Sequence, residues 1–236
     1  MPQKIRADFP YRAALPLLVL LAMAVPPLFP AGSAAETYGY QEKTGTRTSF
    51  FQWQLAVDQA QLATITSREE KALYVNVCDN SGATHEWRMQ KEDAEVTARR
   101  LGNELHIHGR QAGETIDERI TLDDSPWFQP LSYSLRRSLV TGRGREQTFW
   151  MIRPDKLRPQ KFQAVREGEE NISTPAGCFR AVRVRISPAG LLACVWRGYY
   201  WFRLEDGLFL RYEGAHGPPG TPKTTISLAP PGTSGN

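Results

Sequence analysis

The stretch YYWFRLEDGLFLRYE, residues 199–213, decides the fold class that we expect for this chain. Two runs rich in aromatic and branched residues flank EDG at 205–207, and a short loop of this composition joins the strands of a β-hairpin. A three-residue loop with Gly207 in the left-handed conformation puts the large apolar residues of both runs on one face of the sheet. The pairs predicted by this loop are Leu204 with Leu208, Phe202 with Leu210 and Tyr200 with Tyr212.

Short alternating segments separated by turn residues continue upstream of this hairpin. The connections between them are too short for the crossovers that parallel strands need, so we expect an antiparallel sheet. The predicted strands are 71–78, 84–90, 95–100, 104–109, 115–122, 147–153, 161–166, 178–187, 193–204 and 208–213. Residues 224–228 are expected to add a strand at the edge of the sheet, and 229–236 to form a disordered tail.

One segment, SPWFQPLSYSLRRSLV at 125–140, departs from the alternation. Its apolar side chains recur every four residues, and Pro126 suits the first position of a helix, although Pro130 is expected to shorten or kink the first turn. The recurring residues are Trp127, Leu131, Leu135 and Leu139. The expected fold is therefore mainly β, a curved antiparallel sheet with one helix packed on it at about 125–140.

The hairpin formed by 178–187 and 193–204 is expected to turn at Ala189. The pairs that this turn predicts are Val184 with Cys194 and Val182 with Trp196. The outer face of the sheet then gathers arginine and aromatic residues: Arg183, Arg185, Arg197, Tyr199, Trp201, Arg203, Phe209 and Arg211. In this register Arg211 faces Trp201 as a cation–π pair. The face suits an anionic or amphipathic ligand or a protein partner; the alternative is an ordinary exposed face whose rings are covered by arginine stems or by the helix.

The first 35 residues have the order of a cleavable signal peptide. A basic start is followed by the apolar run AALPLLVLLAMAV at 13–25, then by prolines and the small residues AGSAA. A membrane-spanning helix needs about 20 apolar residues, which is more than this run provides. We expect cleavage between Ala35 and Glu36 and a single β-rich domain over 36–228, with no transmembrane segment after cleavage.

Charge gives little support for a nucleic-acid partner. The signal segment holds three of the 29 basic and one of the 25 acidic residues, so the remaining chain is close to neutral. No basic run or RNA-binding aromatic motif is present. We therefore do not expect nucleic acid as a partner. Because no cysteine directly follows the expected cleavage point, we expect no lipid anchor there and a soluble exported protein.

Three cysteines fall within this exported domain, where disulfides can form. In the predicted hairpin register Cys178 and Cys194 lie about 20 Å apart, which is beyond disulfide reach. A disulfide would therefore use Cys78, paired with either of the other two. No CxxC or zinc spacing links the three residues.

Signatures of catalysis and metal binding are weak in this sequence. Glu104, His106 and His108 project from the same face of one predicted strand and are the only metal candidates, but their spacing matches no known zinc signature. No GxSxG, HExxH, phosphate-binding or dinucleotide motif occurs. Cys178 follows a tight turn, yet no base is tied to it, so we name no catalytic residue, expect no cofactor and favour a non-enzymatic protein.

Three stretches carry a family resemblance: 125–138 leading into FWMIRP at 149–154, TPAGCFRAVRV at 174–184, and YWFRLEDGLFLRYEG at 200–214 followed by GPPG at 217–220. Together they resemble an uncharacterised family of exported Gram-negative proteins, a domain of unknown function. That family is similar in turn to the half-open β-barrel of LolA-like periplasmic lipoprotein carriers. Cys178 stands where the turn motif more usually has Thr or a small polar residue, so the resemblance implies no thiol chemistry.

The resemblance implies a periplasmic half-barrel whose apolar concave face is covered by a helical lid and is ready for acyl chains. The lid residues would be Trp127, Phe128, Leu131, Leu135 and Leu139; the alternative is that they fill an ordinary core. The leading hypothesis is thus a non-enzymatic periplasmic protein that binds a lipid or another apolar or amphipathic envelope ligand in a sheet groove. The alternative hypothesis is a module that docks on another envelope protein through its arginine–aromatic face.

Overall fold

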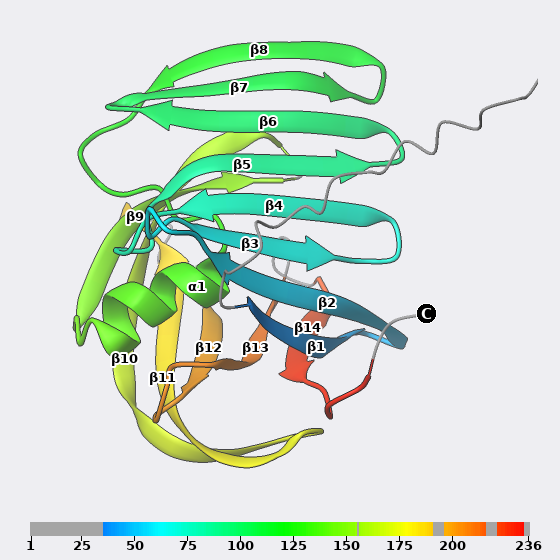
Figure 1. The fold of residues 1–236 in the computed structure, drawn as a ribbon, viewed down its shortest axis with the longest axis vertical. Helices are drawn as coiled ribbons and strands as arrows, with labels where there is room; N and C mark the ends of the chain where they lie inside the picture. The colour runs from blue at the N-terminus through cyan, green and yellow to red at the C-terminus, as the bar shows by residue number, and fades with distance from the viewer. Residues whose placement is uncertain (1–34, 155, 191–195, 216–220, 234–236) are drawn as a thin grey trace, which may run out of the picture.

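The computed structural model describes residues 35–154, 156–190, 196–215 and 221–233, and these form one antiparallel sheet (Figure 1). The sheet has 14 strands within the described residues, in the order β8-β7-β6-β5-β4-β3-β2-β1-β14-β13-β12-β11-β10-β9. The strands are β1 (Ala35–Thr44), β2 (Arg47–Val57), β3 (Ala63–Arg68), β4 (Ala72–Cys78), β5 (Thr84–Lys91), β6 (Ala94–Leu101), β7 (Glu104–Gln111), β8 (Glu114–Thr121), β9 (Glu146–Arg153), β10 (Arg158–Thr174), β11 (Gly177–Pro188), β12 (Gly198–Arg203), β13 (Phe209–Ala215) and β14 (Lys223–Leu228). The expected antiparallel fold with one packed helix is confirmed.

The sheet curls around the helix without closing into a barrel (Figure 1). In the described part of the chain, β8 and β9 each have a single strand neighbour and form the two edges. The first and last strands meet in the middle of the sheet, where Tyr40 of β1 lies opposite Leu228 of β14. The prediction that 224–228 forms an edge strand is therefore wrong, because β14 has β1 on one side and β13 on the other.

The packed chain also extends past the expected end of the domain at 228. Ala229 is buried, and its backbone N–H donates to the Gly39 carbonyl at 2.9 Å. The tail that we expected to be disordered thus begins as part of the fold, and residues 234–236 lie outside the described residues. At the other end, β1 starts at Ala35 and is continuous with Glu36, next to the expected cleavage point, while 1–34 lie outside the described residues.

The helix begins later than its sequence pattern predicts. It consists of α1 (Leu131–Leu135), which continues as the π-helix η1 (Arg136–Thr141), so the predicted start at 125 is wrong. Residues 126–128 instead run along the edge strand β9, where Trp127 forms a parallel bridge with Trp150. Pro130 explains this boundary, because the residue before a proline is forced out of the helical conformation.

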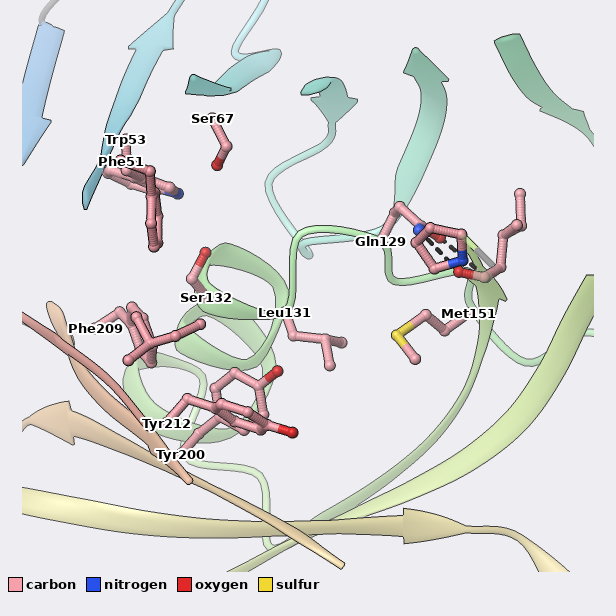
Figure 2. A pocket seen from close by; sticks show the side chains of 13 residues that line it. Phe51, Trp53, Ser67, Gln129, Leu131, Ser132, Met151, Tyr200, Phe209 and Tyr212 are labelled. Carbon is pink, nitrogen blue, oxygen red and sulfur yellow. Dashed lines mark hydrogen bonds between the residues drawn. The ribbon is translucent and has the colours of Figure 1, made fainter. Parts of the chain in front are cut away.

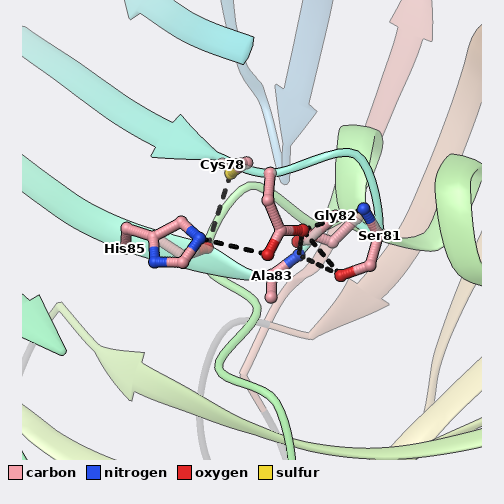
Figure 3. Close-up of polar contacts among 8 residues, drawn as sticks. Cys78, Ser81, Gly82, Ala83 and His85 are labelled. Atoms are coloured by element: carbon pink, nitrogen blue, oxygen red, sulfur yellow. Dashed lines mark hydrogen bonds and ion pairs between the residues drawn. The ribbon is translucent and has the colours of Figure 1, made fainter. Parts of the chain in front are cut away.

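The helix is anchored by the turn between β4 and β5 (Figure 3). Oδ1 of Asp79 accepts hydrogen bonds from the backbone N–H groups of Ser81 at 2.8 Å and Ala83 at 3.1 Å, which shapes the turn. Ser134 of α1 then donates its hydroxyl to the Gly82 carbonyl at 2.6 Å. Gly82 has a φ of +90°, and a Cβ there would lie 2.8 Å from the Ser134 Cα. Only glycine therefore allows the helix to approach this closely.

The register of the hairpin between β11 and β12 differs from the prediction. Val184 lies opposite Tyr200 and Val182 opposite Phe202, so pairing with Cys194 and Trp196 is wrong. The connection is longer than the tight turn expected at Ala189, and its residues 191–195, including Cys194, lie outside the described residues. The inner and outer faces of β12 are nonetheless as predicted, because the shift in register is even and side chains alternate with a period of two.

The predicted turn between β12 and β13 is confirmed, but part of the predicted strand pairing is wrong. Gly207 has a φ of +73°, and Tyr200 lies opposite Tyr212, as predicted. A β-bulge then intervenes, so that Phe202 faces Phe209 and not Leu210. Phe209, expected on the outer face, is consequently buried in the core and contacts Tyr40, whose hydroxyl donates to the Phe209 carbonyl at 2.8 Å.

The buried side chains form two clusters. The aromatic-rich cluster lies between the helix and strands β1–β4 and β9–β14, and includes Tyr40, Phe128, Leu135, Phe149 and Phe202. The second, aliphatic cluster packs β5–β8 against the segment that follows β8 and against the β9–β10 hairpin. It includes Met89, Val96, Ile107, Ile152 and Leu157. Among the described residues, no helix is long and apolar enough to cross a membrane.

Candidate ligand cavity

The five residues predicted as a lid are all buried, and they serve different parts of the core. Phe128, Leu135 and Leu139 are at most 2% exposed and fill the aromatic-rich cluster. Trp127 belongs to the aliphatic cluster. Leu131, which is 7% exposed, is the one that lines a cavity. The helix thus acts mainly as core, and its N-terminal turn forms part of a cavity wall.

The cavity lies on the concave face of the sheet beside that turn and is partly open to solvent (Figure 2). Its volume is about 240 Å³. Apolar and aromatic side chains from β2, β9, β12, β13, β14 and the segment 129–132 dominate its wall. The lining residues are Phe51, Trp53, Ser67, Gln129, Leu131, Ser132, Met151, Ile152, Pro154, Tyr200, Phe209, Tyr212 and Ile226.

None of the described residues that line the cavity carries a charged side chain. Gln129 is fully engaged in the wall, because its Oε1 accepts from Trp127 Nε1 and from the Ile152 N–H, both at 3.0 Å. Trp53 differs: its indole Nε1 is sealed from solvent and has no hydrogen-bond partner. In Figure 2 this nitrogen is on the side of the ring that faces Ser67 and Ser132.

The two tyrosines of the wall remain neutral at all physiological pH values. Burial raises the pKa of Tyr200 well above its ordinary value, with a further increase from neighbouring Tyr212. Burial likewise raises the pKa of Tyr212. The rings lie 4.9 Å apart, centroid to centroid, and give the cavity an aromatic floor. The cavity can thus take an apolar group and offer it neutral hydroxyl and N–H groups.

Most of the arginine–aromatic face is neutralised within the protein. Arg185 Nε lies 2.7 Å from Glu167, and Arg183 Nη1 lies 3.2 Å from Glu170. Glu170 also accepts a hydrogen bond from the Trp201 indole at 2.9 Å. The sequence indicated the arginines, but it did not indicate that β10 supplies acidic partners across the ladder.

Two of the three remaining arginines of that face also form ion pairs within the protein. Arg203 pairs with Asp206 at 2.6 Å, and Arg211 pairs with Glu213. Arg211 also lies 5.8 Å from the Trp201 ring centroid, as the predicted cation–π pair requires, and Arg183 lies 5.8 Å from the Tyr199 ring. Arg197 is exposed and precedes β12. Arginine side chains therefore lie over the Tyr199 and Trp201 rings of this face.

Of the two histidines on β7, His106 has a polar side-chain partner on the neighbouring strand. His106 Nε2 lies 2.6 Å from Asp117 of β8, and the His106 and His108 rings are 4.8 Å apart. Glu104 pairs with Arg119 at 2.7 Å and not with the histidines. Within the described ranges, no group of three metal-ligating side chains is placed to hold a metal ion. The three residues do share one strand face, but they do not converge.

The two described cysteines are both free thiols. Cys78 is buried, and this burial raises the pKa of its thiol to about 12. Cys178 is exposed at the start of β11, with its sulfur 3.2 Å from the Ser173 hydroxyl. The predicted disulfide between Cys78 and Cys178 is therefore absent, and the alternative with Cys194 involves a residue outside the described ones.

Comparison with known structures identifies the fold. No protein-family model matches the sequence, and no curated protein matches it. The crystal structure of a β-barrel-like protein of a domain of unknown function (DUF1849) from Brucella abortus matches with a TM-score of 0.50 and 9% sequence identity, over 82% of this chain and 95% of the Brucella protein. The two proteins share a fold. At this identity the likeness concerns the fold alone.

Two further structures are similar more loosely. One is the MucA/MucB complex of Pseudomonas aeruginosa, with 10% identity and a TM-score of 0.33 over 84% of this chain and 51% of that one. The other is a LolA superfamily protein from Nitrosomonas europaea, with 7% identity and a TM-score of 0.24 over 85% and 86%. The predicted resemblance to an uncharacterised domain of unknown function is confirmed as a likeness of fold, and a LolA superfamily protein is among the structural neighbours.

Proposed function

We propose that this protein is a non-enzymatic binding protein of the periplasm that holds an apolar or amphipathic ligand in the cavity beside α1. The observation that carries the proposal is the cavity itself, about 240 Å³ in volume and lined by uncharged, mainly apolar side chains. Apolar concave sites with a few polar groups are the usual form of small-molecule sites. For comparison, an engineered apolar cavity of about 150 Å³ binds benzene.

The size of the cavity supports useful affinity for a small apolar group. Each methylene removed from water contributes about 0.8 kcal/mol, so a chain of about seven carbons gains roughly 5–6 kcal/mol. Part of this gain is offset by the freedom that the ligand loses on binding. A longer acyl chain would leave its remainder outside, through the open side of the cavity.

One observation supports export to the periplasm: the sequence of residues 1–35 follows the signal-peptide pattern. The arginine–aromatic face supports a docking role less well, because its arginines already pair with Glu167, Glu170, Asp206 and Glu213.

The proposal is tested by native mass spectrometry of protein purified from periplasmic extracts without detergent. We expect the wild-type protein to carry a non-covalent small-molecule adduct. A Met151→Trp variant, which fills the cavity from β9, should carry none while unfolding in urea at a similar concentration. A wild-type protein that has no adduct and does not bind added heptane would contradict the proposed function.

A further inference from the structure

Given the proposed binding function, the chemistry of the cavity wall also restricts which chemical groups the ligand can carry. We propose that the ligand group held in this cavity is electrically neutral and carries a hydrogen-bond acceptor, such as the carbonyl of an ester or amide, which the Trp53 indole N–H recognises. Carboxylate, ammonium and phosphate groups are excluded from the interior of the cavity. An acyl ester meets these requirements.

Neutrality follows from the composition of the wall. None of the described lining residues is Asp, Glu, Lys, Arg or His, so a charged group entering the cavity would find no counter-charge. Moving an ion from water into such surroundings without a partner is strongly unfavourable. The polar groups that the wall does offer are hydroxyl and indole groups, on Ser67, Ser132 and Trp53 among others.

The preference for an acceptor follows from Trp53. An indole nitrogen can only donate a hydrogen bond. Trp53 is 5% exposed, its Nε1 has no partner within the described protein, and the ring belongs to the cavity wall. A buried donor without a partner is costly, so native proteins seldom leave one. A ligand acceptor, reached by a small turn of the ring, would remove this cost.

The strand pairing explains why Trp53 faces the ligand. Trp53 lies on β2 directly opposite Ser67 of β3 and Tyr38 of β1, on the concave face. Its ring contacts Tyr38 with a centroid distance of 6.0 Å. Phe51, two residues earlier, projects from the same face and also lines the cavity. The ring is therefore supported from the side. Its N–H edge is on the side of Ser67 and Ser132 (Figure 2), where the nitrogen is still covered by neighbouring atoms, so a turn of the ring brings it to the ligand.

Four probes of matched chain length test the inference: heptane, methyl pentanoate, hexanoate and hexylamine. Headspace gas chromatography measures the affinity of the two volatile probes, and calorimetry at pH 7 measures that of the two ions. We expect the wild-type protein to bind methyl pentanoate at least about tenfold more tightly than either ion. Trp53→Phe should weaken the binding of methyl pentanoate by about tenfold and change the affinity for heptane by less than about twofold.

Trp201→Phe is the matched control, because that indole donates to Glu170 on the outer face, away from the cavity. It should leave both volatile probes unaffected. The inference about ligand chemistry is wrong if Trp53→Phe weakens the binding of heptane and of the ester equally, or weakens neither. It is also wrong if hexanoate binds as tightly as the ester. In each of these cases cavity binding itself stands. If neither volatile probe binds the wild-type protein, the proposed function itself fails.

A measurement on the wild-type protein covers the case in which Trp53→Phe does not fold. With the tryptophans labelled with ¹⁵N, methyl pentanoate should move one indole N–H resonance downfield, as a new hydrogen bond requires, and heptane should not. An identical response to both probes would overturn the role given to the Trp53 N–H.

Discussion

The two core clusters of this protein pack against the same sheet and differ in the kinds of side chain that form them. Apart from Trp87 and Trp127, the aliphatic cluster uses aliphatic residues such as Ala98, Val96 and Ile107, each at most 1% exposed. The aromatic-rich cluster uses large rings, among them Phe149, Phe202 and Tyr212. The described cavity is lined mainly by members of the aromatic-rich cluster, such as Trp53, Phe209 and Tyr212, with Ile152 added from the aliphatic cluster. The cavity thus lies on the side of the molecule whose core is rich in aromatic rings.

The segment from 126 to 131 joins the two clusters. Trp127 packs in the aliphatic cluster, and its neighbour Phe128 packs in the aromatic-rich one. The Thr84 N–H donates to the Trp127 carbonyl at 2.8 Å, which ties this segment to the start of β5. Because the helix follows directly, its position depends on both clusters.

The largest effect is expected for Trp127→Ala. Truncating a buried tryptophan that is 1% exposed should lower the free energy of unfolding by about 4 kcal/mol. Urea unfolding followed by tryptophan fluorescence and by far-ultraviolet circular dichroism should still give coincident transitions, because the two clusters are coupled through this segment. Separate transitions would show that the clusters unfold independently. Leu101→Ala, at a side chain that is 81% exposed, is the control and should change stability by less than about 0.5 kcal/mol.

A smaller loss is expected for Gly82→Ala, which tests how the helix is anchored. The new Cβ would combine backbone strain at φ +90° with a contact of 2.8 Å to Ser134, and we expect a loss of about 2–3 kcal/mol. Gly113→Ala is the matched control, since its φ is +84° but no atom lies within 4 Å of the added Cβ. Equal losses in the two variants, measured by urea unfolding, would mean that contact with the helix contributes nothing.

The pH dependence of the same turn should be weaker still. Burial alone would raise the pKa of Asp79, but hydrogen bonds from Ser81, His85 and Ala83 outweigh it and lower the pKa below its ordinary value. A lowered folded-state pKa means that the contribution to stability is present above the unfolded-state value of about 3.9 and is lost as the pH falls through the folded-state pKa. Because Asp79 is partly exposed, this contribution is about 1 kcal/mol or less.

The Asp79→Asn variant isolates this contribution. Wild type and variant should differ in their free energy of unfolding at pH 6, and the difference should shrink toward pH 2. Urea unfolding across this range is the measurement. A difference that stays constant with pH would exclude the Asp79 carboxylate as the source.

The smallest effect is expected on the outer face, for Arg119→Ala. Both side chains of its ion pair with Glu104 are exposed to solvent. We therefore expect the free energy of unfolding to fall by less than about 0.5 kcal/mol, and by less still in added salt. Thermal unfolding at low and high ionic strength measures it. A loss above about 1 kcal/mol would mean that this outer face contributes to stability as the two clusters do.

Local patterns explain why much of the sheet could be predicted. Segments such as 84–90 and 147–153 alternate strongly and are bounded by turn residues, and β5 and β9 follow them closely. β1, β2 and β3 were not predicted, although they form the centre of the sheet. β1 mixes Glu36, Gln41 and Lys43 with its apolar residues, so its alternation is weak, and its burial depends on neighbours distant in sequence.

The candidate site was predicted only in part. Leu131 was singled out from its spacing, but Trp53 and Met151 were not, because they come from strands about 100 residues apart that only the curvature of the sheet brings together. The predicted helix start failed at Pro130, where pairing along β9 replaces helical turns. A signal for that boundary was present, since a residue before proline avoids the helical conformation.

The sequence by itself determined the strands with strong alternation, the inner and outer faces of β12, and the left-handed turn at Gly207, because these depend on neighbours a few residues away. Only the tertiary structure decided that β1 pairs with β14, that β10 neutralises Arg183 and Arg185, and that Trp53 and Leu131 share a cavity. These contacts join segments far apart in the chain, and their energies depend on the curvature of the whole sheet, which no local pattern encodes.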